Sequence, residues 1–387
     1  NVSVVLRIVG PRWSMVNHRL EHGAATLGAR PSRTFALVVW PQISDVVISA
    51  ATLVFIYCFT SFGVIAILGG VSRRTLESEI FTQAVRLGNT ETATALAVLQ
   101  AVIICTVIFI AGQSSRPNST SLHVSAPQPL RTKPRHRATP LLISATAVVI
   151  VATPLLATVY RSLVANNQFS FSAWRSIFSG SLPSLSVSPQ SVITTSLIFA
   201  FATACICVPL ALLVAAASGP RWFIASNSAP RELFSLPLVF SAATFGIGLI
   251  ITFNTSPYAW RSERWFIPVI HAVIALPLVI RALEPAAQAI PHPLRNASAT
   301  LGASPFATWV RVELPLLKPA LLRATGLSMA VSLGEFGATS FLSRSGSTTL
   351  PIAIAQLLGR PGVATQQAGF ALAALMVLVT VGVMSRA

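Results

Sequence analysis

The chain consists of long, nearly uncharged apolar segments that alternate with polar connections. A helix needs roughly 20 predominantly apolar residues to cross the hydrocarbon core of a bilayer, and inside lipid a helix satisfies its own backbone polar groups. We predict a membrane-spanning helix in each of eight such segments. They are residues 51–70, 93–112, 140–160, 192–217, 233–253, 265–283, 319–342 and 368–385. The pattern therefore predicts an all-α fold, a polytopic transmembrane helical bundle.

Composition and charge agree with a membrane location. The chain is 53% hydrophobic and only 10% charged, with a mean hydropathy of +0.72, whereas about a quarter of the residues of a soluble domain are charged. A net charge of +17 could indicate a nucleic-acid-binding protein, but the cations are spread through short connections. Every second connection is rich in arginine or lysine, which places those connections in the cytoplasm. We therefore expect a multi-pass protein in contact with lipid and with no nucleic-acid partner.

Cysteine and histidine give no sign of a metal or redox site. Cys58, Cys105, Cys205 and Cys207 all lie within predicted spans and have no ligand-spaced cluster around them, so we expect buried packing thiols. His271 lies on an otherwise apolar span. A hydrogen-bonded packing histidine is favoured there over a metal ligand, because one imidazole is a poor iron site.

A polar segment centred on a glycine occurs twice. Residues 23–41 read GAATLGARPSRTFALVVWP, and residues 297–315 read ASATLGASPFATWVRVELP. A shift of 274 residues aligns the two without a gap, and the same shift pairs Phe62-Gly63 with Phe336-Gly337. We infer an internal duplication.

The repeat defines the organisation that we expect. Residues 1–112 form the C-terminal part of a first half, residues 113–138 form a cytoplasmic linker rich in Ser, Pro and Arg, and residues 139–387 form a second half with six spans. The first half has no counterpart of residues 139–274, and the chain begins with Asn. We therefore expect a fragment, truncated at its N-terminus by about four spans, of a protein with about twelve.

Each half has a long polar connection on the cytoplasmic side. We call the connections at about residues 9–43 and 284–319 the first and second elbows. In each, small residues precede a glycine whose missing Cβ permits a left-handed cap at the end of a short helix, and a proline then begins a new helix. Such a hairpin can dock into a groove on another protein or can merely cap the bundle. Two copies at equivalent positions favour docking.

The elbow spacing resembles the cytoplasmic EAA loop of permease subunits in binding-protein-dependent ATP-binding cassette (ABC) importers. The resemblance implies a type I ABC importer permease fold with two homologous halves, in which each loop forms a coupling helix that sits in a cleft of an ATPase subunit. The chain departs from the family at His22 and Asn296, where glutamate is usual, and Glu21 and Glu284 are out of register. The positions of the match are Gly23, Ala24, Ala25, Gly28 and Pro41, and Ala297, Ser298, Ala299, Gly302 and Pro315.

The resemblance also implies a function. Two fused permease halves, with the stretches SFGVIAILGG and GEFGATSFLSRSGSTTLPIAI, are similar to the subgroup that imports ferric iron or thiamine. The resemblance favours ferric iron as the substrate, with thiamine or an oxyanion such as molybdate or sulfate as alternatives. It implies a prokaryotic inner membrane, and as partners a homodimer of cytoplasmic ABC ATPase subunits and an extracytoplasmic substrate-binding protein.

The chain lacks the motif of a nucleotide-hydrolysing enzyme. No G-x-x-x-x-G-K-[ST] phosphate loop occurs, and the only lysines are Lys133 and Lys318. We therefore expect a transport permease and not an enzyme, with no cofactor bound by this chain and with ATP and Mg on the partner ATPase. An ion-coupled secondary transporter would also have internal repeats, but it should carry more intramembrane acids.

One acid lies deep within a predicted span. An acid near the bilayer centre costs roughly 2.5 to 3.5 kcal/mol on insertion scales, so it usually faces a cavity or a partner. Glu335 could line the translocation path with Ser332 and Phe336. Alternatively, it could pair with Arg344 or pack neutral between helices. Its repeat counterpart is Ser61, and the sequence leaves both interpretations open.

Overall fold

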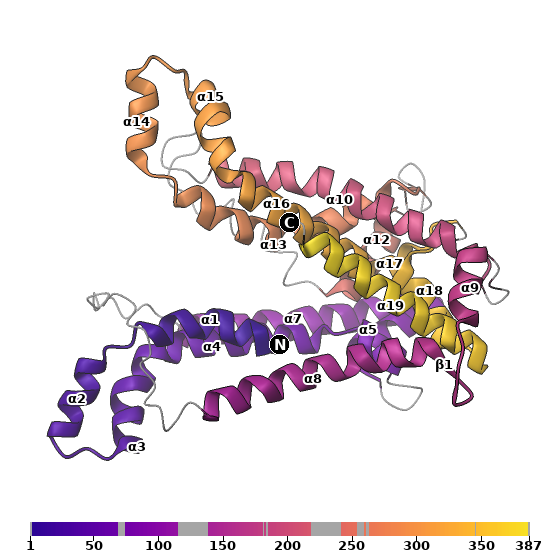
Figure 1. The fold of residues 1–387 in the computed structure, drawn as a ribbon, viewed down its shortest axis with the longest axis horizontal. Coiled ribbons are helices and arrows are strands. Elements are labelled where there is room, and N and C mark those ends of the chain that lie inside the picture. Colours follow the sequence, from indigo (N-terminus) through magenta and orange to yellow (C-terminus); the bar gives the residue numbers. More distant parts are fainter. Residues whose placement is uncertain are drawn as a thin grey trace. The chain divides into compact units, whose positions relative to one another are not determined.

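The part of the chain that the structure describes is almost entirely helical (Figure 1). The computed structural model describes residues 2–68, 74–114, 138–180, 182, 185–217, 241–253, 259–260, 263–344 and 346–385. Within these residues, seven helical stretches are long and apolar enough to cross a membrane. They are Pro31–Ala66, Thr90–Gln113, Leu141–Leu163, Pro189–Ala215, Phe266–Gln288, Pro305–Gly334 and Val363–Ser385. The predicted fold class, a transmembrane helical bundle, is therefore confirmed.

Two predicted segments fall largely outside the described residues. Of the span predicted at 233–253, the structure describes α12 (Ala242–Phe253). Of the linker predicted at 113–138, it describes only the two ends, which belong to α7 (Thr90–Ser114) and α8 (Ala138–Leu163).

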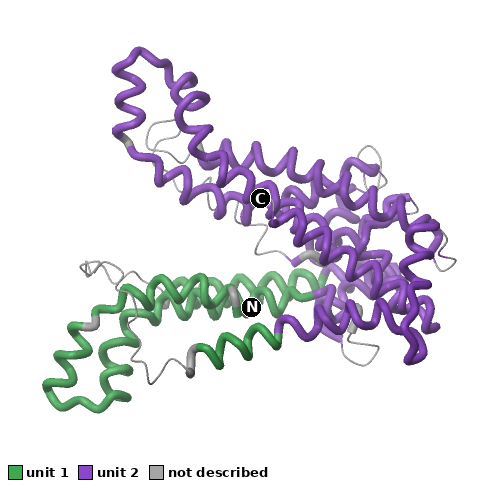
Figure 2. Tube along the Cα trace, viewed as in Figure 1, with its two compact units in different colours: residues 1–61, 95–150 green, residues 62–94, 151–387 purple. Residues whose placement is uncertain are grey.

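The described helices form two compact units, coloured separately in Figure 2. The first unit comprises Asn1–Ser61 and Ala95–Ile150. It holds most of α7, the first part of α8 and a hairpin in which α1 packs along α4. Before α7 its elements are α1 (Val2–Ser14), α2 (His18–Thr26), α3 (Pro31–Thr34), the π-helical turn η1 (Phe35–Val39) and α4 (Trp40–Phe59).

The second unit comprises Phe62–Thr94 and Val151–Ala387, so it includes a segment of each sequence half. Its first-half elements are α5 (Gly63–Leu68), α6 (Leu76–Phe81) and the π-helical turn η2 (Thr82–Arg86). Its second-half elements begin with β1 (Val164–Ala165), β2 (Gln168–Phe169), α9 (Ser172–Ser179), α10 (Pro189–Ala217) and α12. They continue with α13 (Phe266–Gln288), α14 (His292–Thr300), α15 (Pro305–Thr308), η6 (Trp309–Glu313), α16 (Leu314–Gly334), α17 (Gly337–Leu342), α18 (Leu350–Leu358) and α19 (Val363–Ser385).

Small side chains build the core of the second unit. Helices α10, α13 and α16 pack against one another through buried residues that include Ala211, Ala275 and Ala324. In membranes, small residues let helix backbones approach closely and so increase dispersion contacts. This three-helix core holds α16, and with it the second elbow and the helix break that follows α16.

The same element order occurs in both halves at the shift found in the sequence. α2 and α14 begin at His18 and His292, and η1 and η6 begin at Phe35 and Trp309. α5 spans Gly63–Leu68, and α17 spans Gly337–Leu342. The duplicated sequence therefore builds two equivalent series of elements, each running from an elbow through a long helix to a break and a short helix.

The two breaks correct the sequence prediction. Continuous spans were predicted at 51–70 and 319–342, but α4 ends at Phe59 before α5, and α16 ends at Gly334 before α17. At the second break Glu335 has ψ near 115°, an extended conformation. A hydropathy window averages over such a point, because the flanking residues are apolar and a break of two residues hardly changes the mean.

Candidate functional site: two elbows and an intramembrane polar cluster

The first elbow turns at a glycine that its backbone conformation requires. The Gly28 N–H donates to the Ala25 carbonyl, and the Ala29 N–H donates to the Ala24 carbonyl, both at 3.0 Å. These two bonds form a Schellman motif, which satisfies the last carbonyls of α2. Gly28 has φ of +77°, and nothing lies within 4 Å of where its Cβ would be. The left-handed conformation, rather than crowding, therefore selects glycine here.

The second elbow has the same turn. The Gly302 N–H donates to the Ala299 carbonyl at 3.0 Å, and the Ala303 N–H donates to the Ser298 carbonyl at 3.1 Å. Gly302 has φ of +79°. The left-handed glycine caps expected from the sequence are therefore confirmed in both elbows.

The spacing from the glycine to the second proline, which both elbows share, also has a local cause. Pro41 and Pro315 are each the second residue of a long helix, and a five-residue π-helical turn precedes each helix. Within these turns the Trp40 N–H donates to the Phe35 carbonyl, and the Leu314 N–H donates to the Trp309 carbonyl. Proline lacks the N–H that an α-helical ladder would use, and the wider turn occurs where that ladder is interrupted.

Each elbow exposes a leucine at the residue before its capping glycine. Leu27 is 89% exposed and Leu301 is 87% exposed, and each directly precedes the capping glycine. Gly23, Ala25, Ala297 and Ala299 are also exposed, whereas Ala24 and Ser298 are half-buried. The same residue type is therefore almost fully exposed at the same position of both elbows.

The second elbow is fastened by side chains that the first does not have. Arg295 Nε donates to Glu313 Oε1 at 2.6 Å, and Arg295 Nη2 donates to Glu313 Oε2 at 3.3 Å. A further bond of 2.8 Å joins the hydroxyls of Ser298 and Thr308. Both bonds tie α14 to the chain that returns to the membrane. The first elbow has valine, Val39, at the position of Glu313, so this ion pair cannot form there.

A glutamine fastens the base of the first elbow instead. Gln42 Nε2 donates to the Val38 carbonyl at 2.7 Å, and Gln42 Oε1 accepts from the Asn17 N–H at 3.3 Å. Arg12 Nε donates to the Gln42 carbonyl at 3.2 Å. The sequence did not indicate either set of bonds. Except for the local Gln42–Val38 bond, the partners are 10 or more residues apart and face each other only after the hairpin has formed.

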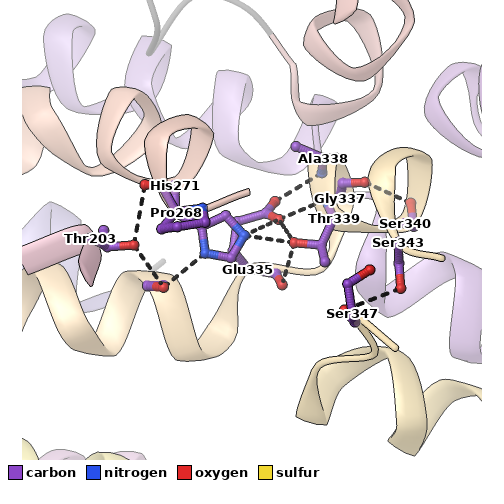
Figure 3. A network of polar contacts seen from close by, with 11 residues as sticks. Thr203, Pro268, His271, Glu335, Gly337, Ala338, Thr339, Ser340, Ser343 and Ser347 are labelled. Carbon is purple, nitrogen blue, oxygen red and sulfur yellow. Dashed lines mark hydrogen bonds and ion pairs between the residues drawn. The ribbon is translucent and has the colours of Figure 1, made fainter. Parts of the chain in front are cut away.

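Glu335 caps the short helix that follows the break after α16 (Figure 3). Its Oε1 accepts from the Ala338 N–H at 3.0 Å. Its Oε2 accepts from the Thr339 N–H at 3.0 Å and from Thr339 Oγ1 at 2.6 Å. Backbone N–H groups at a helix start attract negative charge, so this acid has specific partners within the protein.

His271 joins this cap to the neighbouring helices (Figure 3). Its Nδ1 lies 2.8 Å from Ser332 Oγ, its Nε2 lies 2.8 Å from Thr339 Oγ1, and the same Nε2 lies 3.7 Å from Glu335 Oε2. The sequence interpretation of His271 as a hydrogen-bonded packing histidine is therefore confirmed. Among the described residues, the basic side chain beside Glu335 is His271, and not Arg344.

Phe336, the residue after Glu335, belongs to an aromatic cluster. Its ring stacks on Phe62, with centroids 5.3 Å apart and an interplanar angle of 17°. Phe62 also contacts Phe81 and Phe341, at 5.1 and 6.4 Å between centroids. The sequence selected Phe336 as a candidate but not Phe62. The signal was available, since the 274-residue shift pairs these two residues.

The cysteine prediction was wrong for three positions. Only Cys207 is buried, whereas Cys58, Cys105 and Cys205 are exposed on the surfaces of their helices. A spanning helix can turn an apolar thiol toward lipid as readily as toward another helix, and hydropathy does not distinguish these directions. Among the described residues, no group of three or more His, Cys, Asp or Glu could hold a metal ion.

Comparison with known proteins identifies the family. The family described as "Binding-protein-dependent transport system inner membrane component" matches residues 14–117 and 221–386, one range in each sequence half. The chain belongs to this family. It is therefore a multi-pass inner-membrane protein, and its two family regions resemble the fused arrangement expected from the repeat.

Individual relatives are permease proteins of several transport systems. The chain is 31% identical over 154 residues to the "Putative 2-aminoethylphosphonate transport system permease protein PhnV" of Salmonella typhimurium, covering 40% of this chain and 57% of the relative. It is 32% identical over 205 residues to the "Molybdenum transport system permease protein ModB" of Haemophilus influenzae, covering 48% and 87%. It is 24% identical over 356 residues to the "Thiamine transport system permease protein ThiP" of S. typhimurium, covering 87% and 61%. The chain thus spans less than two thirds of the first and third of these relatives.

Proposed function

We propose that this chain is the permease component of an ABC importer and that its two elbows receive motion from separate ATPase subunits. The observation that carries the proposal is the pair of equivalent elbow tips. Each combines a Schellman turn at glycine with a leucine that is almost fully exposed, Leu27 or Leu301. An apolar side chain on a rigid turn can fill a partner's pocket at little entropic cost.

The geometry suits two copies of one partner. Both tips have the same backbone turn and the same leucine at its centre, so each can enter the same kind of cleft. A homodimer of ATPase subunits offers two identical clefts. ATP and Mg are then bound by the ATPase, and an extracytoplasmic binding protein delivers the substrate from the other side of the membrane.

The substrate is the finer part of the proposal. The similar permeases are named for 2-aminoethylphosphonate, molybdenum and thiamine, and none of these three names supports ferric iron. Ferric iron stays a prediction from the sequence resemblance. Calorimetric titration of the cognate binding protein with ferric iron, molybdate, thiamine and 2-aminoethylphosphonate tests all four, and binding of one alone assigns the substrate.

Valine substitutions at the capping glycines test the docking function. A side chain in the left-handed region costs about 1–2 kcal/mol, so Gly28→Val and Gly302→Val should distort the elbow tips. We expect each variant to lose co-purification with the ATPase. Gly88→Val is the matched control, because Gly88 also has positive φ, +68°, and nothing within 4 Å of its Cβ position, but lies outside both elbows. Full ATPase capture by both elbow variants would refute the docking assignment.

A further inference from the structure

Phe62 and Phe336 are equivalent residues of the two repeats that touch each other. The 274-residue shift pairs them, and both precede a glycine that begins a short helix, α5 or α17. In a protein built from two equivalent repeats, a residue contacts its own counterpart only near the axis that relates the repeats. The stacked rings therefore mark where the first-half segment 62–94 and the second half meet within the second unit.

The position of the stack matters for transport. In transporters built from internal repeats, the substrate site lies at the interface between the repeats. A solute that passes between the halves must therefore cross the line on which the two rings lie. Phe62 is only 3% exposed, and offset rings with centroids 5.3 Å apart leave no space for water between their faces.

Helix length places the stack in the outer part of the membrane. α16 has 21 residues between the second elbow and the break, and at 1.5 Å per residue it is about 30 Å long. α4 has 20 residues between the first elbow and its own break. With the elbows on the cytoplasmic side, as the proposed function requires, both phenylalanines lie toward the extracytoplasmic end of the bundle.

We propose that the stacked Phe62 and Phe336 rings form the outer barrier of the translocation path. The inference rests on the permease function proposed above. Two apolar rings in contact exclude water and ions, and a hydrophobic constriction of this kind closes a pore by dewetting. The barrier opens when the two halves separate and the rings lose contact.

The structure around the rings fits a barrier that must open and re-form. Each ring lies at a helix break beside a glycine, where the backbone can turn without bending a long helix. A Cβ on Gly63 would approach Phe336 Cδ1 to 3.3 Å, so the glycine lets the rings come together. A Cβ on Gly246 would approach Phe341 to 2.6 Å. This glycine therefore makes room for the Phe341 ring, which contacts Phe62.

The polar cluster of His271, Ser332, Glu335 and Thr339 then positions the Phe336 ring. Glu335 directly precedes Phe336, and its carboxylate fixes the first turn of α17 while His271 ties that turn to α13 and α16. The acid therefore orients Phe336 without facing the path itself. This assigns Glu335 and Ser332 a supporting position beside the path and Phe336 a position in it.

Ion leakage tests the barrier directly. The probe is potassium, trapped in proteoliposomes that hold the complete importer without nucleotide, and its release is followed with an electrode. We expect Phe62→Ala/Phe336→Ala to lose the potassium gradient that the unmodified importer retains. The matched control is Phe55→Ala/Phe59→Ala, which removes a stack of the same geometry, 5.3 Å and 15°, within α4, and it should retain the gradient. ATPase co-purification establishes that each variant is assembled.

Two further variants keep the proposal falsifiable. With the native cysteines replaced by alanine, Phe62→Cys/Phe336→Cys should lose transport when an oxidant links the pair and regain it with reductant. Glu335→Gln, which keeps an accepting oxygen, should leak less than Glu335→Ala. An assembled double-alanine variant that holds potassium, or a linked pair that still transports, overturns the barrier. Loss of ATPase capture by elbow variants with no change in leakage affects the docking function alone.

Discussion

The two elbows have the same backbone and different fastenings. Both have a nine-residue helix, a left-handed glycine and a π-helical turn before a proline. The second is tied by the Arg295–Glu313 ion pair, whereas the first depends on the amide of Gln42. The duplication thus retained what the backbone requires, namely glycine, proline and small residues. The side chains that stiffen each elbow diverged, which indicates that tip geometry, and not the manner of support, is the shared requirement.

Substitution of the exposed leucines should have the largest effect, a loss of ATPase binding. Leu27→Asp and Leu301→Asp place a charge where we propose that an apolar side chain enters the ATPase. Residues at the centre of an interface contribute about 2 kcal/mol or more, so each variant should weaken ATPase binding by about 30-fold. Surface plasmon resonance with the purified ATPase measures this loss. A marked effect at one elbow and none at the other would break the equivalence of the two tips.

Removal of the Arg295–Glu313 ion pair should have the second-largest effect, a loss of local stability confined to the second elbow. Arg295 and Glu313 are 26% and 17% exposed, so solvent screens the pair only in part. Removing it with Glu313→Gln should cost about 1 kcal/mol of local stability. Hydrogen exchange of the α14 amides should become faster, while α2 is unchanged.

A charge exchange sharpens this result. Arg295→Glu/Glu313→Arg restores the attraction with the signs reversed, so protection of α14 should return. High salt should accelerate exchange in α14 and leave α2 unaffected. An equal salt response in both helices would show that the fastenings do not differ as described.

Removal of the Gln42 hydrogen bonds should destabilise the first elbow and leave the second unchanged. Gln42→Leu introduces the residue that the second elbow has at this position, Leu316, and removes bonds to the Asn17 N–H and the Val38 carbonyl. We expect a loss of about 1 kcal/mol, with faster exchange in α2 alone. Leu316→Gln is the matched control and should gain nothing, because the counterpart of Asn17 is Pro291, which has no N–H to donate.

Removal of an exposed ion pair outside the elbows should have the smallest effect on stability. Arg74 and Glu79 lie 3.0 Å apart, with Arg74 52% exposed. Hydrogen bonds from Gln83 and then Arg74 hold the pKa of Glu79 below its ordinary value. A depressed carboxyl pKa contributes stability above the unfolded pKa and loses it as the pH falls through the folded pKa, so the pair should persist below the ordinary pKa of glutamate. Glu79→Gln should leave thermal stability at pH 7 almost unchanged, in contrast to Glu313→Gln.

Hydropathy and the repeat predict much of this molecule, and the reasons are physical. Long apolar helices are the only simple way for this chain to satisfy its backbone in lipid. The left-handed glycines Gly28 and Gly302 follow from local sequence, because few residues other than glycine adopt that conformation. Features of this kind depend on neighbours in the chain.

Features that depend on distant partners were not predicted. The break at Glu335 exists because an acid caps α17 and meets His271, 64 positions earlier in the chain. The contact of Phe62 with Phe336 required two helix breaks to face each other, and the Arg295–Glu313 pair required the hairpin to close. The exposed cysteines show the same limit, since the direction of a side chain on a spanning helix depends on its neighbours.

Cysteine labelling at the elbow tips tests the central claim most directly. Leu27→Cys and Leu301→Cys, in protein without its native cysteines, are treated with a membrane-impermeant maleimide in vesicles of known orientation. Both positions should react only from the cytoplasmic side, and bound ATPase should protect both. Labelling of either tip from the outer side, or equal labelling with and without the ATPase, would contradict the account.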